Sequence, residues 1–164
     1  MVFDDLKEFQ AGLRRGSRLL GLDVGTKTIG LALSDVSLTI ASPYDTIRRR
    51  RFAADAEALD RVITAQEVSG LVIGLPVSMD GTEGPRCQSV RQFARNLIER
   101  SDRAIFFWDE RLSTQVIQRM LVEEVDMTRQ RRAVVVDKLA ATYILQGALD
   151  AINRDSAQRR AVEP

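Results

Sequence analysis

Two acidic residues stand in apolar surroundings, where a solvated surface acid is not expected. Asp23 lies inside the hydrophobic run 19–24, and Asp137 shares one face of a predicted helix with Val134 and Ala141, because helical neighbours recur three and four positions apart. Burying an isolated carboxylate is costly, so each acid must be paired, bound to a metal ion or turned toward a cleft. The alternatives are a strand-end acid that faces solvent and a buried acid without a function.

A pair of acids, Asp109 and Glu110, follows directly after the apolar run 104–108. Acids at the carboxyl end of a central strand lie where open α/β sheets place their ligands, although they also favour this position when a helix N-terminus follows. With Asp23 and Asp137, the pair supplies carboxylates from three separate elements. Such a set suits hard divalent cations and two-metal phosphoryl chemistry.

The polar turn after Asp23 has the composition of a phosphate-binding loop. Gly25 allows the backbone to approach a phosphate closely, and Thr26 and Thr28 offer hydroxyl groups. Lys27 adds a point charge. A hairpin turn of this composition also occurs without a ligand, so the turn supports this chemistry only together with the acids.

The composition of the 164 residues excludes several other kinds of site. Because the chain has no histidine and one cysteine, Cys87, it cannot form a Ser-His-Asp triad, a histidine-ligated zinc site or a disulfide framework. Its 24 basic residues are 21 Arg and 3 Lys, with clusters at 48–51 and 129–132. Arginine binds phosphate well, so the net charge of +1 does not exclude a nucleic-acid partner. Genomic composition and a solvated loop at 48–51 are the alternative explanations.

Hydrophobic periodicity predicts helices and strands in one domain. The expected strands are 19–24, 29–35, 39–47, 71–75 and 104–108. The expected helices are 53–68, a segment that contains 90–98, 113–122 and a last helix that ends near 152. Gly70 is expected to end the first of these helices, and Pro43 indicates that 39–47 is an edge strand.

This order of elements predicts an α/β fold with a mixed five-stranded sheet, in which three antiparallel strands precede two parallel ones and helices cover both faces. The domain is expected at 18–152, after a weakly packed polar leader at 1–17 and before a polar C-terminal tail at 153–164. The acidic N-terminus does not resemble a signal peptide, and no apolar run approaches the ~20 residues that cross a membrane. A cytoplasmic protein is therefore expected.

Four segments, in chain order, resemble the signature blocks of a known family: 22–35, 74–81, 109–114 and 137–141. They begin Leu-Asp-Val-Gly-Thr, Gly-Leu-Pro-Val, Asp-Glu-Arg-Leu and Asp-Lys-Leu-Ala, and they are similar to those of the YqgF/RuvX family of pre-16S rRNA nucleases, formerly called Holliday-junction resolvases. The resemblance covers residues 18–152. It implies a ribonuclease H-like fold and metal-dependent hydrolysis of RNA phosphodiesters, in 5′-end maturation of pre-16S rRNA during ribosome biogenesis.

The resemblance also implies roles for particular residues. It makes Asp23, Glu110 and Asp137 the catalytic acids and the ligands of Mg²⁺ or Mn²⁺. Resolvases of the wider superfamily carry an acid at the end of the fourth strand, where this chain has Gly74, so Glu110 is expected to take over that role. The residues expected to bind or orient the substrate phosphate are Gly25, Thr26, Lys27, Asp109 and Arg111.

Three other functions are compatible with the same residues. Leu-Asp-Val-Gly-Thr is also similar to the first phosphate loop of sugar kinases and actin-like ATPases, but those proteins enclose a nucleotide between two such domains, and 164 residues leave no room for the second. A carboxylate cleft with a basic rim also suits a non-catalytic RNA-binding or ribosome-assembly factor. Branched DNA, in the form of a four-way Holliday junction, is an alternative substrate.

Overall fold

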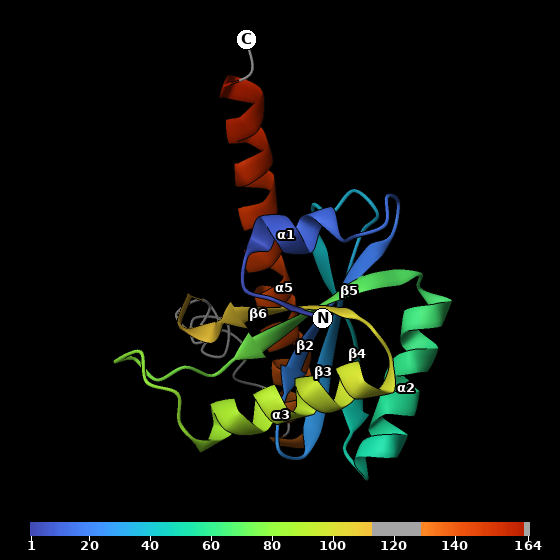
Figure 1. Cartoon of the computed structure of the whole chain (residues 1–164). Coiled ribbons are helices and arrows are strands. Elements are labelled where there is room, and N and C mark those ends of the chain that lie inside the picture. Colours follow the sequence, from blue (N-terminus) through green and yellow to red (C-terminus); the bar gives the residue numbers. More distant parts are fainter. Residues whose placement is uncertain (113–128, 163–164) are drawn as a thin grey trace.

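A mixed β-sheet forms the centre of the computed structural model, which describes residues 1–112 and 129–162 (Figure 1). The strands of these residues are Val2–Phe3 (β1), Arg18–Val24 (β2), Thr28–Ser34 (β3), Ala41–Arg48 (β4), Val68–Leu75 (β5) and Ala104–Asp109 (β6). They pair in the order β1-β6-β5-β2-β3-β4. The strands β2, β3 and β4 are antiparallel neighbours, whereas β5, β6 and β1 extend the sheet from β2 in parallel.

Most of this sheet agrees with the prediction from sequence. Three antiparallel strands followed by two parallel ones confirm the mixed α/β class. Pro43 lies in β4, the outer strand at that edge of the described sheet, where the missing N–H group of proline interrupts no inner ladder. The central strand β5 is buried along its length except at Ser69, as expected for a strand that is covered on both faces.

The sheet has one strand more than predicted, because the N-terminal residues take part in the fold. Val2 and Phe3 pair with β6, and helix α1 (Leu6–Ala11) follows them. Phe9 of α1 is fully buried, and its ring centroid lies 6.0 Å from that of Phe3 and 5.6 Å from that of Phe106. The expected five strands and the expected weakly packed leader are corrected accordingly, since three aromatic rings anchor this segment to the sheet.

Helices cover both faces of the sheet, as predicted (Figure 1). The remaining helices are α2 (Phe52–Ala65), α3 (Pro85–Arg100), the 3₁₀ turn η1 (Glu110–Leu112) and α5 (Arg129–Val162). Leu59 of α2 and Phe93 of α3 belong to the core of one face, and Ile144 of α5 belongs to the core of the other. The predicted helix 113–122 lies outside the described residues, as does most of the charged stretch 123–132. Within the described ranges, no helix is both long enough and apolar enough to cross a membrane.

Two helix boundaries differ from the prediction. Helix α2 ends sooner than expected, and Gly70 lies inside β5, where a Cβ atom would come within 2.9 Å of the Phe9 ring. Helix α5 ends later than expected. Ile152 is its last buried residue, but the helix continues to Val162. Asp155 and Arg159, one turn apart, form an ion pair of 2.7 Å in this polar extension. The segment expected to be a polar tail is therefore largely helical.

Glycines on neighbouring strands let α5 lie very close to the sheet. A Cβ atom on Gly21 of β2 would lie 2.7 Å from the Cβ atom of Leu145 and 2.8 Å from the carbonyl oxygen of Ala141. A Cβ atom on Gly30 of β3 would overlap with the main chain of Asp137. Only glycine leaves room for such an approach. Contact between main chains therefore sets the position of α5 at Asp137.

Replacing Gly30 with alanine is expected to displace α5, because the new methyl group meets the helix main chain and not a flexible side chain. We expect Gly30→Ala to lose about 3 kcal/mol of unfolding free energy, measured by urea denaturation. Gly12→Ala is the matched control, since its Cβ atom would make ordinary contacts of 3.5 Å or more and should cost less than about 1 kcal/mol. Equal stability of the two variants would contradict the close packing of α5.

Candidate active site

Three separate elements bring Asp23, Glu110 and Asp137 to one edge of the sheet. Asp23 lies near the carboxyl end of β2 and pairs with Gly30 of β3. Glu110 opens the 3₁₀ turn that directly follows β6, and Asp137 lies where α5 contacts Gly30. Asp23 interacts electrostatically with both of the other carboxylates. The three acids that the sequence singled out therefore form one cluster.

Burial and mutual repulsion raise the pKa values of two of these acids. The pKa of Asp23 rises from an ordinary 3.8 to about 6, first because the carboxyl group is buried and second because Asp137 is near. The pKa of Glu110 rises from an ordinary 4.5 to about 7, again mainly through burial, with repulsion by Asp23 as the second cause. Arg86 opposes both shifts without cancelling them. Burial and repulsion together therefore outweigh the effect of Arg86 on both carboxyl groups.

Glu110 lies in space that a side chain at position 74 would need. A Cβ atom on Gly74 would come within 2.6 Å of Oε1 of Glu110 and would also collide with Ile144. Gly74 is near the carboxyl end of β5, the strand between β2 and β6. The missing side chain on β5 therefore makes room for the carboxylate from the turn after β6. This arrangement is consistent with the prediction that Glu110 replaces an acid at the end of this strand.

Thr28 holds the carboxylate of Asp137 in place. Its hydroxyl group donates a hydrogen bond of 2.5 Å to Oδ2 of Asp137. Its carbonyl oxygen accepts a hydrogen bond of 2.9 Å from the N–H group of Gly25, so one residue closes the turn and contacts α5. The sequence suggested that this hydroxyl faces a phosphate, and the structure directs it to Asp137 instead.

Arg49 supports the turn after β2. Its main-chain N–H group donates to the carbonyl oxygen of Lys27 at 2.9 Å, and its Nη1 atom donates to the carbonyl oxygen of Gly25 at 2.7 Å. Its Nε atom lies 3.6 Å from the carboxylate of the buried Asp55, and its guanidinium lies over the ring of Phe93. This member of the arginine run is therefore part of the scaffold and not of a solvated loop.

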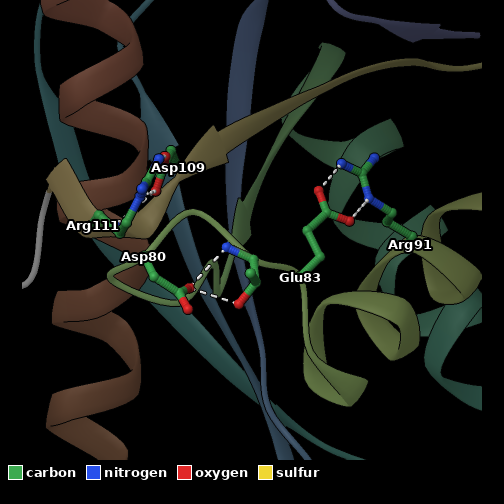
Figure 2. A network of polar contacts seen from close by, with 6 residues as sticks. Asp80, Glu83, Arg91, Asp109 and Arg111 are labelled. Carbon is green, nitrogen blue, oxygen red and sulfur yellow. Dashed lines mark hydrogen bonds and ion pairs between the residues drawn. The ribbon is translucent and has the colours of Figure 1, made fainter.

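Asp109 forms an ion pair with Arg111 (Figure 2). Nε and Nη2 of Arg111 donate to Oδ2 of Asp109 at 2.9 and 2.6 Å, and these hydrogen bonds hold the pKa of Asp109 below its usual range. The loop between β5 and α3 lies alongside. Asp80 of this loop interacts electrostatically with Arg111, and Glu83 accepts two hydrogen bonds from Arg91.

Arg86 is the residue of this region to which sequence patterns assigned no role of its own. It lies in the first turn of α3 and lowers the pKa values of both Asp23 and Glu110. The chain has 21 arginines, so residue type alone does not distinguish Arg86 from the others. The available signal was its position directly after Gly84 and Pro85, a pair typical of a helix start.

The donor chemistry of the cluster fits a divalent cation. Carboxylate oxygens are preferred ligands of Mg²⁺ and Mn²⁺. A cation would stabilise the ionised forms of Asp23 and Glu110, which burial first and repulsion second make unfavourable. Among the described residues, no three acidic or cysteine side chains already converge as a metal site. The acids are near one another but not yet arranged as ligands of one ion.

Fold and site together define the class of this protein as ribonuclease H-like, with an acidic cluster at the carboxyl edge of the parallel strands. The same fold occurs in T. thermophilus RuvC, solved in complex with a Holliday junction substrate, which superposes with a TM-score of 0.50. That match covers 78% of this chain and 91% of RuvC, and 10% of the aligned residues are identical, so it supports the fold alone.

The chain belongs to the RuvX family, whose model, described as "Holliday junction resolvase", matches residues 17–151. A relative from Paramagnetospirillum magneticum is 64% identical over 143 residues, which cover 87% of this chain and 92% of the relative. A relative from Rhodospirillum rubrum is 54% identical over 159 residues, covering 97% of this chain and 99% of the relative. Both relatives are named "Putative pre-16S rRNA nuclease". The resemblance noted from the signature segments is thereby confirmed.

The raised pKa values make the stability of the metal-free protein depend on pH. The folded protein keeps protons on Asp23 and Glu110 up to about pH 6 and 7, whereas the ordinary values for the unfolded chain are 3.8 and 4.5. The free energy of unfolding therefore decreases as the pH rises from about 4 to about 7. In Asp23→Asn this decrease is expected to be smaller by about 3 kcal/mol, from the rise of the Asp23 pKa from 3.8 to about 6, measured by urea denaturation with a chelator present.

The control for this measurement is Asp45→Asn, at an exposed position of β4, which should keep the pH dependence of the wild type. If Asp23→Asn also kept it, the raised pKa of Asp23 would be contradicted.

The hydrogen bond from Thr28 to Asp137 predicts different effects for two substitutions. Thr28→Val keeps the shape of the side chain but removes the donor, and we expect it to lower the unfolding free energy by about 1–2 kcal/mol. Thr28→Ser keeps the hydroxyl group and should lose clearly less. Urea denaturation of both variants checks this, and equal losses would show that the hydrogen bond is not the cause.

Proposed function

We propose that this protein hydrolyses RNA phosphodiesters with the help of a divalent cation, and that its substrate is the 5′ region of pre-16S rRNA. The observation that carries the proposal is the cluster of Asp23, Glu110 and Asp137 at one edge of the sheet. The names of the relatives that are 64% and 54% identical support an RNA substrate. The reaction would take place in the cytoplasm, where a bacterium makes its ribosomal RNA precursors.

The three acids are the proposed ligands of Mg²⁺ or Mn²⁺. A bound ion of this kind polarises the phosphate and makes water a stronger nucleophile at neutral pH. The chain itself contributes the positions of the ligands: Gly74 leaves room for Glu110, and Thr28 orients Asp137. Because the acids are held together against their own repulsion, they are prepared to bind a cation without a large rearrangement of the fold.

The turn after β2 is the proposed contact for the substrate phosphate. Lys27 and the hydroxyl group of Thr26 would stabilise the charge that develops on the phosphate during an in-line displacement. Gly25 shapes the turn, because its N–H and carbonyl groups already bond within the protein. Arg111 would reach the substrate through Nη1, since Asp109 accepts hydrogen bonds from its Nε and Nη2 atoms.

A four-way DNA junction is the second candidate substrate. The observation that favours it is the description of the matching family model as a Holliday junction resolvase. The same acids would serve either substrate, because RNA and DNA phosphodiesters are hydrolysed by the same in-line chemistry.

Asp23→Asn is expected to lower the rate of metal-dependent cleavage of precursor RNA by about a thousandfold or more, because the three acids act as one unit. Circular dichroism and a thermal melt verify that the variant is folded. Asp45→Asn removes an acid from the exposed side of β4 and should cleave like the wild type. Undiminished cleavage by Asp23→Asn would refute the assignment.

Two further measurements separate the alternatives. Mn²⁺ should raise the melting temperature of the wild type more than that of Asp23→Asn, which tests the metal site without reference to activity. Cleavage of precursor RNA and of a four-way DNA junction under the same conditions identifies the substrate. Tight RNA binding without cleavage of either one would identify a non-catalytic binding factor instead.

A further inference from the structure

We propose that the pocket between the β2–β3 turn and helix α3 binds a second phosphodiester of the nucleic-acid strand, next to the one held at the carboxylate cluster. The inference rests on the proposed function and extends it to a neighbouring subsite. The pocket has a volume of about 170 Å³ and is lined on one side by Gly25 and Thr26 and on the other by Arg86 and Ser89. Arg49 forms part of its wall.

The lining of this pocket has the chemistry of an anion site. Its lining residues include two arginines, Arg49 and Arg86, and two hydroxyl-bearing residues, Thr26 and Ser89, beside the apolar Val24, Pro85 and Val90. Guanidinium and hydroxyl donors are the groups with which proteins hold the phosphates of a nucleic-acid backbone. None of the described residues that line this pocket carries a carboxylate, so nothing in the lining repels an anion.

A second pocket, beside β6, has the opposite character. Its lining includes the carboxylates of Asp4, Glu83 and Asp109. The arginines there already form ion pairs: Arg91 with Glu83, and Arg111 with Asp109 (Figure 2). A phosphate in this pocket would face the like charges of three carboxylates. Of the two pockets, the one at the β2–β3 turn is therefore the one suited to a phosphodiester.

Arg86 connects the proposed subsite with the acidic cluster. It lines the pocket, and it also lies close enough to Asp23 and Glu110 to hold their pKa values down. On the main chain, Asp23 is separated from Gly25 of the pocket by one residue. A strand with one phosphate at the acids would thus place an adjacent phosphate beside Arg86, on the same side as the turn.

Arg49 makes the subsite rigid before a ligand arrives. Its guanidinium is fixed by the carbonyl oxygen of Gly25 at 2.7 Å, by Asp55 at 3.6 Å and by the ring of Phe93, whose centroid is 5.4 Å away. A group that is already ordered loses little conformational entropy when it binds. Because this residue also supports the fold, Arg86 and Ser89 are better positions for a test.

The test compares Arg86→Gln with Arg95→Gln, a matched control on the exposed side of the same helix that contacts Gln92. Both substitutions are made in Asp23→Asn, so that single-stranded RNA is bound but not cleaved. Arg86→Gln should weaken binding about tenfold and lower the slope of log K against log salt by about 0.7, the value for one phosphate contact on a single strand. Arg95→Gln should change affinity by less than about twofold.

RNA carrying one neutral methylphosphonate, moved along the strand position by position, locates the contact. A methylphosphonate at one position next to the expected cleavage site should weaken RNA binding by the protein that has Arg86, but not by Arg86→Gln. Ser89→Ala leaves the charge unchanged and should make this loss of binding at the same position smaller. The proposal is overturned if Arg86→Gln binds like Arg95→Gln, or if every position responds alike in both proteins. If the positional effect is found but protein with intact acids cleaves neither RNA nor junction DNA, the proposed nuclease function fails and the subsite stands.

Discussion

The contact between the main chain of α5 and the glycines of the sheet is the constraint on which the rest of the structure depends. Gly21 and Gly30 leave no room for a Cβ atom beneath the helix, and glycine in a strand costs about 0.5–1 kcal/mol relative to alanine. Burial of Ile144, Leu145 and their neighbours on α5 offsets that cost. The result is that Asp137, on a helix far along the chain, comes within reach of Thr28 and of the acid on β2.

The acidic cluster is held together by packing and not by attraction among its members. Burial raises the pKa values of Asp23 and Glu110, and repulsion adds to both shifts, from Asp137 on Asp23 and from Asp23 on Glu110. The ionised cluster therefore opposes folding when no cation is present. Burial of the apolar cores on the two faces of the sheet offsets the free energy that the buried acids cost the folded state. A site of this kind gains stability when it binds a positive ion, and the same neighbourhood contains the arginine and hydroxyl groups suited to a polyanion.

Much of the fold could be predicted from local patterns, and the misses have identifiable causes. Continuous apolar runs indicated the inner strands, and acids within such runs indicated the cluster. The strand at Val2–Phe3 has two residues and no periodicity, so only its pairing partner reveals it. Gly70 was expected to end a helix, whereas it lies inside β5, where the side chains of Leu13 and Phe9 crowd the position of a Cβ atom. Arg49 and Arg86 were hidden among 21 arginines, because composition does not distinguish a guanidinium that faces a carbonyl oxygen from one that faces solvent.

The sequence by itself determined the mixed α/β class, the three acids and the exclusion of histidine chemistry, because residue type, periodicity and family signatures are properties of short segments. The tertiary structure alone decided which acids meet, that Thr28 bonds to Asp137, and that Gly74 makes room for Glu110. It also decided that Arg86 lines a pocket at the β2–β3 turn and lies near Asp23 and Glu110. These facts depend on the distance between segments far apart in the chain, and that distance is fixed by packing, which no local pattern encodes.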